Sequence, residues 1–298
     1  MGNLLQRSVH FGWLSLALFL GCFSFKVYAA TETPGAPRII ALAPHLTELV
    51  YSAGAGDYLV GVVNYSDYPP AAKQLPVIGS YTAINLEAIL QLKPTLILTW
   101  RSGNRVQDLA ALERLQTRQG VRLVSSDVRR LSDIPDLIEQ IGRLAGTEAI
   151  AQPKAQALRT ELQRLTETYA QRRPLSVFYQ IWNQPLLTMG PEQFISQGIT
   201  LCGGRNLFED LPGLTGQVAL ETVIERNPQV ILLGGQKAFQ NDWYQTWQKY
   251  PNLKAVAQQQ VHKLDNDLYQ RSTERFIYAL DPLCQLLEQA RQKFEAAP

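Results

Sequence analysis

Aromatic and polar side chains gather in segments that follow predicted strands, where a parallel α/β sheet presents its ligand-facing loops. In the first half of the chain these segments are residues 64–70 and 100–104, and in the second half they are 181–184 and 267–271. Any one aromatic alone would more simply be a core or surface residue. Aromatic faces stack on flat ligands, and amide or guanidinium groups fix the orientation of the ligand. Their recurrence at strand ends therefore indicates a binding site for a large, flat, partly polar ligand.

The sequence offers little for catalysis or metal binding. Of the three histidines, His10 falls in a predicted export signal and His262 stands alone. His45 directly follows the first predicted strand, so it either faces a cleft or, as the simpler interpretation, caps a helix through a hydrogen bond. The sequence contains no HxH pair, no phosphate-binding glycine loop and no nucleophile elbow. We therefore predict no catalytic residue, no metal site and no cofactor.

One segment of the sequence occurs twice. Residues 85–98 read NLEAILQLKPTLIL, and residues 219–232 read ALETVIERNPQVIL. Each copy is typical of a short amphipathic helix that ends near a proline and leads into an apolar strand buried on both faces. The repeat predicts two similar α/β lobes, and the cleft between them is the first place to expect a ligand.

The first lobe is predicted to span residues 38–148. Its strand and helix patterns alternate, which is typical of a parallel sheet. Apolar runs predict strands at 38–42, 60–63, 95–99 and 121–124. Helical spacing of apolar residues predicts helices at 44–53, 106–118 and 134–144.

A long helical pattern runs from Pro153 to about Arg172, and it falls midway between the two copies of the repeat. A proline fits the first turn of a helix, where its missing N–H would be unpaired anyway. We assign residues 149–173 to a helix that bridges the lobes, although packing against a single lobe would also explain its apolar stripe. The second lobe then covers residues 174–298, with strands at 175–179, 230–233 and 261–264 and helices near 191–199 and 273–294.

Residues 1–29 have the features of a secretory signal peptide: an arginine, an apolar block at residues 11–25 and small residues before a cleavage site after Ala29. Lipidation at Cys22 is the alternative, and it would tether the chain to a membrane. Removing the signal takes away two basic residues and no acidic one, so the formal net charge falls from +2 to zero. Such a balance does not favour nucleic-acid binding. We expect an exported, soluble protein in the periplasm.

Two cysteines remain after the signal, Cys202 and Cys284. Export places them where disulfides persist, so pairing is the simplest interpretation. A reactive thiol pair is the alternative, but the CxxC spacing typical of such pairs is missing.

Several segments together resemble a known family, the class III or helical-hinge substrate-binding proteins of ABC importers. The repeated Leu-Glu pairs and the CGGRNLF segment at 202–208 are typical of the wider family. The YSDYPP segment at 65–70 and the WRSGN segment at 100–104 resemble its corrinoid-binding members. The resemblance runs from Arg38 to about Arg291.

The resemblance implies an α/β fold of two lobes with parallel sheets, joined by one long helix, that closes little on binding. It implies a monomer that delivers intact cobalamin, vitamin B12, to an ABC-importer permease, with a ferric siderophore or haem as the alternative ligand. An exported enzyme on the same scaffold is the alternative class of protein, and the missing general base or metal argues against it. The resemblance also implies a disulfide between Cys202 and Cys284.

The residues of the binding site and of the docking surface follow from the same resemblance. Glu87 and Glu221, the acids of the two repeat copies, would pair with arginines of the permease. Tyr81, Thr215 and Leu268 stand where corrinoid-binding members have tryptophans. Eight side chains would line the ligand site: Tyr65, Tyr68, Tyr81, Trp100, Arg101, Trp182, Tyr269 and Arg271.

Overall fold

The computed structural model describes residues 35–80 and 82–296. The predicted signal peptide, Cys22 and Tyr81 lie outside the described residues. From Ala36 on, the chain forms one compact unit. No helix among the described residues is long and apolar enough to cross a membrane.

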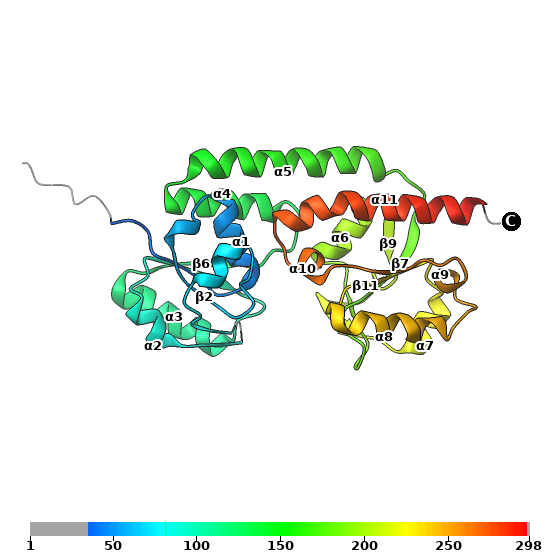
Figure 1. Ribbon diagram of the computed structural model, residues 1–298, viewed down its shortest axis with the longest axis horizontal. Coiled ribbons are helices and arrows are strands. Elements are labelled where there is room, and N and C mark those ends of the chain that lie inside the picture. The colour runs from blue at the N-terminus through cyan, green and yellow to red at the C-terminus, as the bar shows by residue number, and fades with distance from the viewer. Residues whose placement is uncertain (1–34, 81, 297–298) are drawn as a thin grey trace, which may run out of the picture. The chain divides into compact units, whose positions relative to one another are not determined.

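Two four-stranded parallel sheets organise the fold (Figure 1). The first has the order β2-β1-β5-β6 and contains β1 (Ile39–Ala41), β2 (Leu59–Val62), β5 (Leu96–Trp100) and β6 (Arg122–Ser126). The second has the order β12-β11-β7-β9 and contains β7 (Leu175–Gln180), β9 (Gly204–Asn206), β11 (Val230–Leu233) and β12 (Val261–Lys263). Numbered along each half of the chain, both sheets have the strand order second, first, third, fourth. The prediction of two similar lobes with parallel sheets is therefore confirmed.

The apolar strands send alternate side chains to opposite faces of their sheets, as period-two geometry requires. In β1, Ile39 joins one hydrophobic cluster and Ile40 joins another. In β11, Val230 joins the same cluster as Ile39, whereas Ile231 lies in a third. The first cluster, which we call the shared core, thus contains residues of both sheets and of helices from both halves of the chain. One continuous apolar core joins the two lobes.

Both copies of the repeated segment fold as a helix followed by the third strand of a sheet. In the first copy α2 (Leu86–Gln91) leads to β5, and in the second α7 (Leu220–Arg226) leads to β11. The Asn85 side chain caps α2 by accepting a hydrogen bond from the backbone N–H of Ala88. Asn227 ends α7 in a left-handed conformation. The predicted succession of helix and strand is confirmed for both copies.

The other main helices are α1 (Pro44–Ser52), α3 (Val106–Gln119), α4 (Asp133–Ala145), α6 (Phe194–Leu201), α8 (Lys237–Gln248) and α11 (Glu274–Ala296). Several short elements that the sequence patterns did not predict lie between them. They are η1 (Gly56–Tyr58), η2 (Pro70–Gln74), β3 (Gly79–Ser80), β4 (Ala83–Ile84), β8 (Leu187–Met189), β10 (Thr215–Gln217), α9 (Lys254–Ala257) and α10 (Asn266–Tyr269).

Helix α5 (Glu148–Tyr169) begins one residue before the assigned bridging helix, but the helical pattern that placed Pro153 in the first turn was wrong. The carbonyl of Thr147 accepts a hydrogen bond from the N–H of Ala151, which starts the helix directly after α4. Pro153 therefore lies inside α5 instead of in its first turn. Packing supports this early start, because a Cβ on Gly142 would lie 2.3 Å from the Cβ of Ala151. Glycine at this position lets α4 and α5 approach closely.

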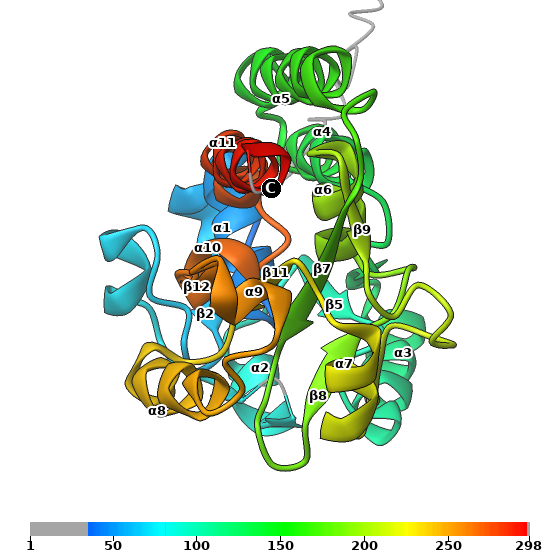
Figure 2. The same ribbon diagram turned by 90° about the vertical axis from the view of Figure 1, so that its right-hand side faces the viewer.

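Helix α5 connects the two sheets, since it follows α4 and precedes β7. Figures 1 and 2 show it running alongside α4 and α11, with which it is in contact. Ion pairs also join it to α11, from Lys154 to Glu274 at 3.3 Å and from Arg164 to Asp281 at 2.7 Å. The lobe boundaries assigned at residues 149 and 173 stay a prediction.

Cys202 and Cys284 form a disulfide, as predicted. Cys202 directly follows α6, Cys284 lies in α11, and both are fully buried. The bond closes a loop with a sequence separation of 82 and ties the last helix to the second sheet.

Replacing both cysteines by alanine is expected to lower the free energy of unfolding by about 4 to 5 kcal/mol, the chain-entropy value for a loop of this length. Scanning calorimetry and urea unfolding measure the loss. Ligand affinity should persist, because neither cysteine lines the cavities described below. Peptide mapping without reductant should recover the linked pair, and two free thiols in the native protein would contradict the prediction.

Candidate functional site

The loops that could bind a ligand leave the two sheets at equivalent places. In the first sheet β1 and β5 are neighbours, but the chain continues from β1 to β2 on one side and from β5 to β6 on the other. In the second sheet β7 and β11 stand in the same relation, with β9 and β12 on opposite sides. At such a switch point the loops after the two central strands diverge and leave a crevice at the carboxyl edge of the sheet.

Two neighbouring cavities lie where these loops of the two lobes face one another. Their volumes are about 320 Å³ and 360 Å³, and small-molecule sites are commonly of this size. They share His45 at the start of α1, Trp100 at the end of β5 and Gln270 beside α10. The wall of the first cavity has an apolar part, made of Val128, Ile181, Phe194, Ile195 and Leu214, and a polar part, made of Ser102, Asp127, Gln193, Thr215 and Ser272. The second is more polar, and its wall includes Tyr65, Gln236, Asn266, Asp267 and Arg271.

Trp100 is positioned by the tight turn that follows β5. The buried Asn104 side chain accepts a hydrogen bond from the Trp100 backbone N–H at 2.7 Å and donates one to the Leu42 carbonyl at 2.9 Å. A Cβ on Gly103 would lie 2.0 Å from the indole, so glycine is needed for the turn to pass beside the ring. The WRSGN segment therefore places an aromatic ring in the walls of both cavities, held by its own glycine and asparagine.

His45 lines both cavities, and the helix-cap interpretation of this residue is wrong. Ala43 occupies the N-cap position of α1, and neither ring nitrogen of His45 has a hydrogen-bond partner among the described residues. The imidazole and the indole of Trp100 form a T-shaped pair, with 5.2 Å between ring centroids. Burial, reinforced by the charge of Arg271 and opposed by that of Asp127, lowers the pKa of His45 from 6.5 to about 4. The imidazole is therefore neutral at physiological pH.

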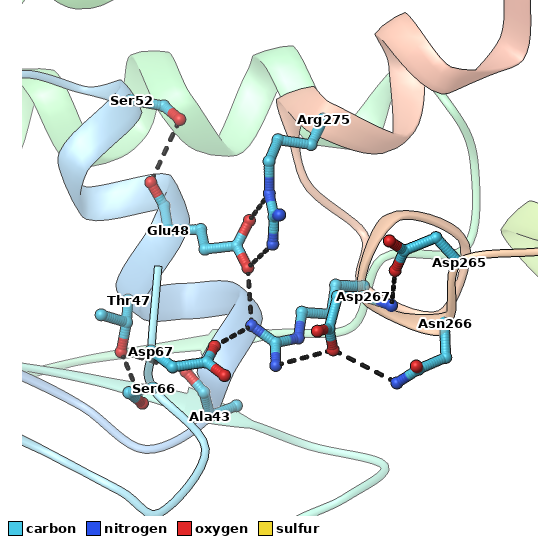
Figure 3. Close-up of polar contacts among 11 residues, drawn as sticks. Ala43, Thr47, Glu48, Ser52, Ser66, Asp67, Asp265, Asn266, Asp267 and Arg275 are labelled. Carbon is cyan, nitrogen blue, oxygen red and sulfur yellow. Dashed lines mark hydrogen bonds and ion pairs between the residues drawn. The ribbon is translucent and has the colours of Figure 1, made fainter. Parts of the chain in front are cut away.

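An ionic cluster with a buried centre joins the two lobes beside the second cavity (Figure 3). Glu48 on α1 is its centre and is 3% exposed. The Glu48 carboxylate accepts hydrogen bonds from Arg271 at 2.9 Å and from Arg275 on α11 at 2.6 and 2.9 Å. Arg271 also pairs with Asp67 at 2.8 Å and with Asp267 at 3.1 Å. We call these five residues the interlobe clasp.

The YSDYPP segment is anchored to α1 next to the clasp. The hydroxyl of Thr47 donates a hydrogen bond to that of Ser66 at 3.0 Å. Tyr68 lies against the clasp itself, because the guanidinium of Arg275 sits 3.8 Å from the centroid of its ring. Tyr65 has a left-handed φ of 66°, is 71% exposed and lines the second cavity. Of these two predicted ligand residues, the structure thus brings Tyr65 to the cavity wall and Tyr68 to the clasp.

Three other predicted ligand residues lie outside both cavities. Arg101 is exposed on the turn after β5. Trp182 is 39% exposed, and its indole N–H donates a hydrogen bond to the Gln184 carbonyl at 3.0 Å. Tyr269 belongs to the shared core, and its hydroxyl donates to the Ala279 carbonyl at 2.8 Å. The structure therefore places Tyr269 in the core rather than at the ligand site, because the short helix α10 turns its ring inward.

The charged side chains in the cavity walls have a net negative charge. They are Asp127, Asp267 and Arg271, because His45 is neutral. Arg271 is the only cation among the described residues that line the cavities, and it already contacts three carboxylates of the clasp. The site is therefore better suited to a neutral or cationic ligand than to an anion.

Glu87 and Glu221 occupy matching positions in the first turns of α2 and α7. Both are exposed, and neither forms an ion pair within the part of the chain that the structure describes. Two carboxylates at equivalent points of the two lobes are thus available to a partner. Their role in docking stays a proposal.

Several lining residues were missed by the sequence analysis. Asp127 directly follows β6, so the rule that ligands meet strand ends would have found it. Gln270 lies within the predicted segment 267–271, but only Tyr269 and Arg271 of that segment were predicted as ligand residues. Phe194 does not follow a strand of the two main sheets, and no local pattern marks it as a lining residue. Thr215, which stands where corrinoid-binding members have a tryptophan, lines the first cavity.

Comparison with known proteins agrees with this architecture. The family model of periplasmic binding proteins matches residues 39–268. A vitamin B12-binding protein of Vibrio cholerae serotype O1 is 37% identical over 258 residues, which cover 87% of this chain and 91% of the relative. The vitamin B12-binding protein of Photorhabdus laumondii is 37% identical over 278 residues, which cover 92% of this chain and 94% of the relative.

Solved structures agree as well. The crystal structure of the periplasmic vitamin B12 binding protein BtuF of Vibrio cholerae matches with a TM-score of 0.78 and 37% identity, covering 86% of this chain and 98% of that one. The periplasmic heme-binding protein RhuT of Roseiflexus, at 24% identity and a TM-score of 0.73, shares the fold. Two lobes with a cavity at facing switch points define a binding protein. The chain belongs to the periplasmic binding protein family.

Proposed function

We propose that this chain is the extracytoplasmic substrate-binding protein that delivers a corrinoid, vitamin B12, to an ABC importer. The observation that carries the proposal is the pair of cavities between the lobes, in a chain 37% identical to a protein named vitamin B12-binding protein over 87% of its length. The proposed location is the periplasm, and the proposed partner is the importer permease. The protein acts as a monomer that binds its ligand without transforming it.

The charge of the cavity walls favours a corrinoid over the alternative ligands. Haem carries two propionates and many ferric siderophores are anionic, so either would call for cations in the wall. The cavity walls instead carry two carboxylates, Asp127 and Asp267, and one guanidinium, Arg271. The positive charge of Arg271 is already paired with Glu48 of the clasp. Cobalamin is neutral or positive, depending on its upper axial ligand. A ferric siderophore or haem is therefore the weaker candidate.

Retention of a coloured ligand tests the proposal. The purified mature protein is mixed separately with cyanocobalamin, haem and an anionic ferric tris-catecholate siderophore, and each mixture is desalted before its visible spectrum is recorded. We expect cyanocobalamin to be retained at one to one and the other two to be lost. Retention of haem or the siderophore together with loss of cyanocobalamin would refute the proposal.

Trp100→Ala is expected to weaken corrinoid binding by about 1 to 3 kcal/mol, the scale for losing a buried aromatic anchor. The physical reason is that Trp100 contributes to the walls of both cavities. Calorimetric titration measures the change. Trp182→Ala makes the same chemical change outside both cavities, and we expect a smaller loss from it. Wild-type affinity in a folded Trp100→Ala variant would remove Trp100 from the site.

A further inference from the structure

His45 is a polar cavity residue whose hydrogen-bonding capacity the protein leaves unused. It is 7% exposed, and it lines both cavities. Neither of its ring nitrogens has a hydrogen-bond partner among the described residues. The ring nitrogens of His45 are not among the fully enclosed polar atoms that lack a partner, so they are open to the cavities. A group that enters the cavities is therefore the natural partner of this imidazole.

Neighbouring residues hold the imidazole in place. His45 follows Pro44 in the first turn of α1, and the next turns of this helix bury Leu46 and Leu49 in the shared core. The ring of Trp100 packs nearly perpendicular to the imidazole, with an angle of 85° between the two ring planes. A ring fixed by its helix on one side and by an indole on another presents its nitrogens in a defined direction, which favours a directional bond.

The imidazole also keeps its lone pair at neutral pH. Its pKa of about 4 means that protonation does not compete for that lone pair in the periplasmic range of pH. Neutral imidazole is the commonest side-chain ligand of transition metals. Asp127 and Asp267 give the cavity walls a negative potential, which favours a metal centre that carries positive charge.

We propose that His45 binds the cobalt of the corrinoid at its upper axial position. This inference rests on the proposed function, because it needs a corrinoid in the cavities. The bond between cobalt(III) and a weakly held water breaks, a bond from a nitrogen of His45 forms, and the water leaves as a neutral molecule. Neither the oxidation state nor the number of protons changes. A corrinoid whose upper ligand does not exchange, such as cyanocobalamin, binds without this bond, so the protein distinguishes corrinoids by the lability of that ligand.

The visible spectrum of aquocobalamin reports this bond, since its bands shift when a nitrogen replaces water on the cobalt. Aquocobalamin and cyanocobalamin are titrated separately into the wild type, His45→Ala and His45→Gln, of which the last keeps a polar side chain of similar size. We expect the wild type to shift the bands of aquocobalamin and to leave those of cyanocobalamin unchanged. Both variants should lose the shift. The ratio of aquocobalamin to cyanocobalamin affinity should fall by on the order of tenfold, the lower end of the effects seen around metal ligands.

His262→Ala is the matched control, because His262 lies on β12, outside both cavities, and contacts Gln260 at 3.1 Å. This variant should keep the shift. One-to-one binding of aquocobalamin by the wild type without a spectral shift would overturn the inference and leave the proposed function standing. A shift that survives in His45→Ala would overturn it too. Failure to retain either corrinoid would instead refute the proposed function, and this inference with it.

Discussion

The double variant Glu87→Arg/Glu221→Arg is expected to bind its ligand with wild-type affinity and to lose importer-dependent uptake completely. Both glutamates are exposed and lie outside the cavities, so ligand binding should not sense the change. In the proposed complex each carboxylate faces arginines of the permease, and reversal would set like charges against each other at a cost of several kcal/mol. Calorimetry measures the ligand affinity, and uptake into vesicles that contain the reconstituted permease measures transport.

The simpler account is that both acids only stabilise helix starts, where a glutamate interacts with the helix dipole by about 0.3 to 1 kcal/mol. That account predicts a slightly less stable protein with normal transport. A control variant, Glu113→Arg/Glu167→Arg, makes the same change of charge at exposed positions of α3 and α5. It should transport normally. Normal uptake by the first double variant would remove these two glutamates from docking.

Glu48→Gln is expected to lower the free energy of unfolding by about 3 kcal/mol, the lower end for removing one partner of a buried ion pair. Among the described residues, Arg275 has no other carboxylate within ion-pair distance, whereas Arg271 keeps Asp67 and Asp267. Both guanidiniums retain some exposure, which limits the loss. For a protein of this size the melting temperature should fall by about 6 to 12 °C. Scanning calorimetry measures it.

Glu192→Gln is the matched control for the clasp. Glu192 also forms an ion pair between the lobes, with Arg129 at 2.9 Å, but the two side chains are 57% and 49% exposed. Exposed pairs contribute about 0 to 1 kcal/mol, so the melting temperature should change little. If Glu48→Gln melted at the same temperature as Glu192→Gln, the clasp would contribute nothing to the stability of the protein.

The central strands could be predicted from the sequence, because a strand buried on both faces of a parallel sheet needs an unbroken apolar run. β5 and β11 are such runs, and their repetition also indicated the two lobes. β9 escaped prediction. Its residues, Gly204–Asn206, show no apolar pattern, and they form a strand because they pair with β7 at the edge of the second sheet.

The segments that line the cavities could be predicted from the sequence, but the orientation of their individual side chains could not. Trp100 and Arg271, which line the cavities, were singled out because they stand in segments that follow strands, where parallel sheets bind ligands. The direction of a single side chain depends on short turns. Asp265 caps α10 by accepting a hydrogen bond from the Asp267 N–H, and the turn then points Tyr269 into the core.

Contacts between distant segments could not be predicted. Glu48 lies in the first helix of the chain and Arg275 in the last, and they meet only in the folded protein. A single sequence gives no sign of such a pair. The same limit explains why the clasp was missed although Arg271 was singled out.

We expect the shared core to keep the distance between Glu87 and Glu221 nearly constant when a ligand binds. Rotating one lobe away from the other would expose apolar surface of that core and pull the clasp apart, so we expect the empty and the loaded protein to present the two glutamates in nearly the same way. Empty copies would then compete with loaded ones for the same permease. The permease would then recognise a loaded copy by the exposed part of its ligand rather than by the shape of the protein. The rate of uptake would be proportional to the fraction of copies that carry ligand.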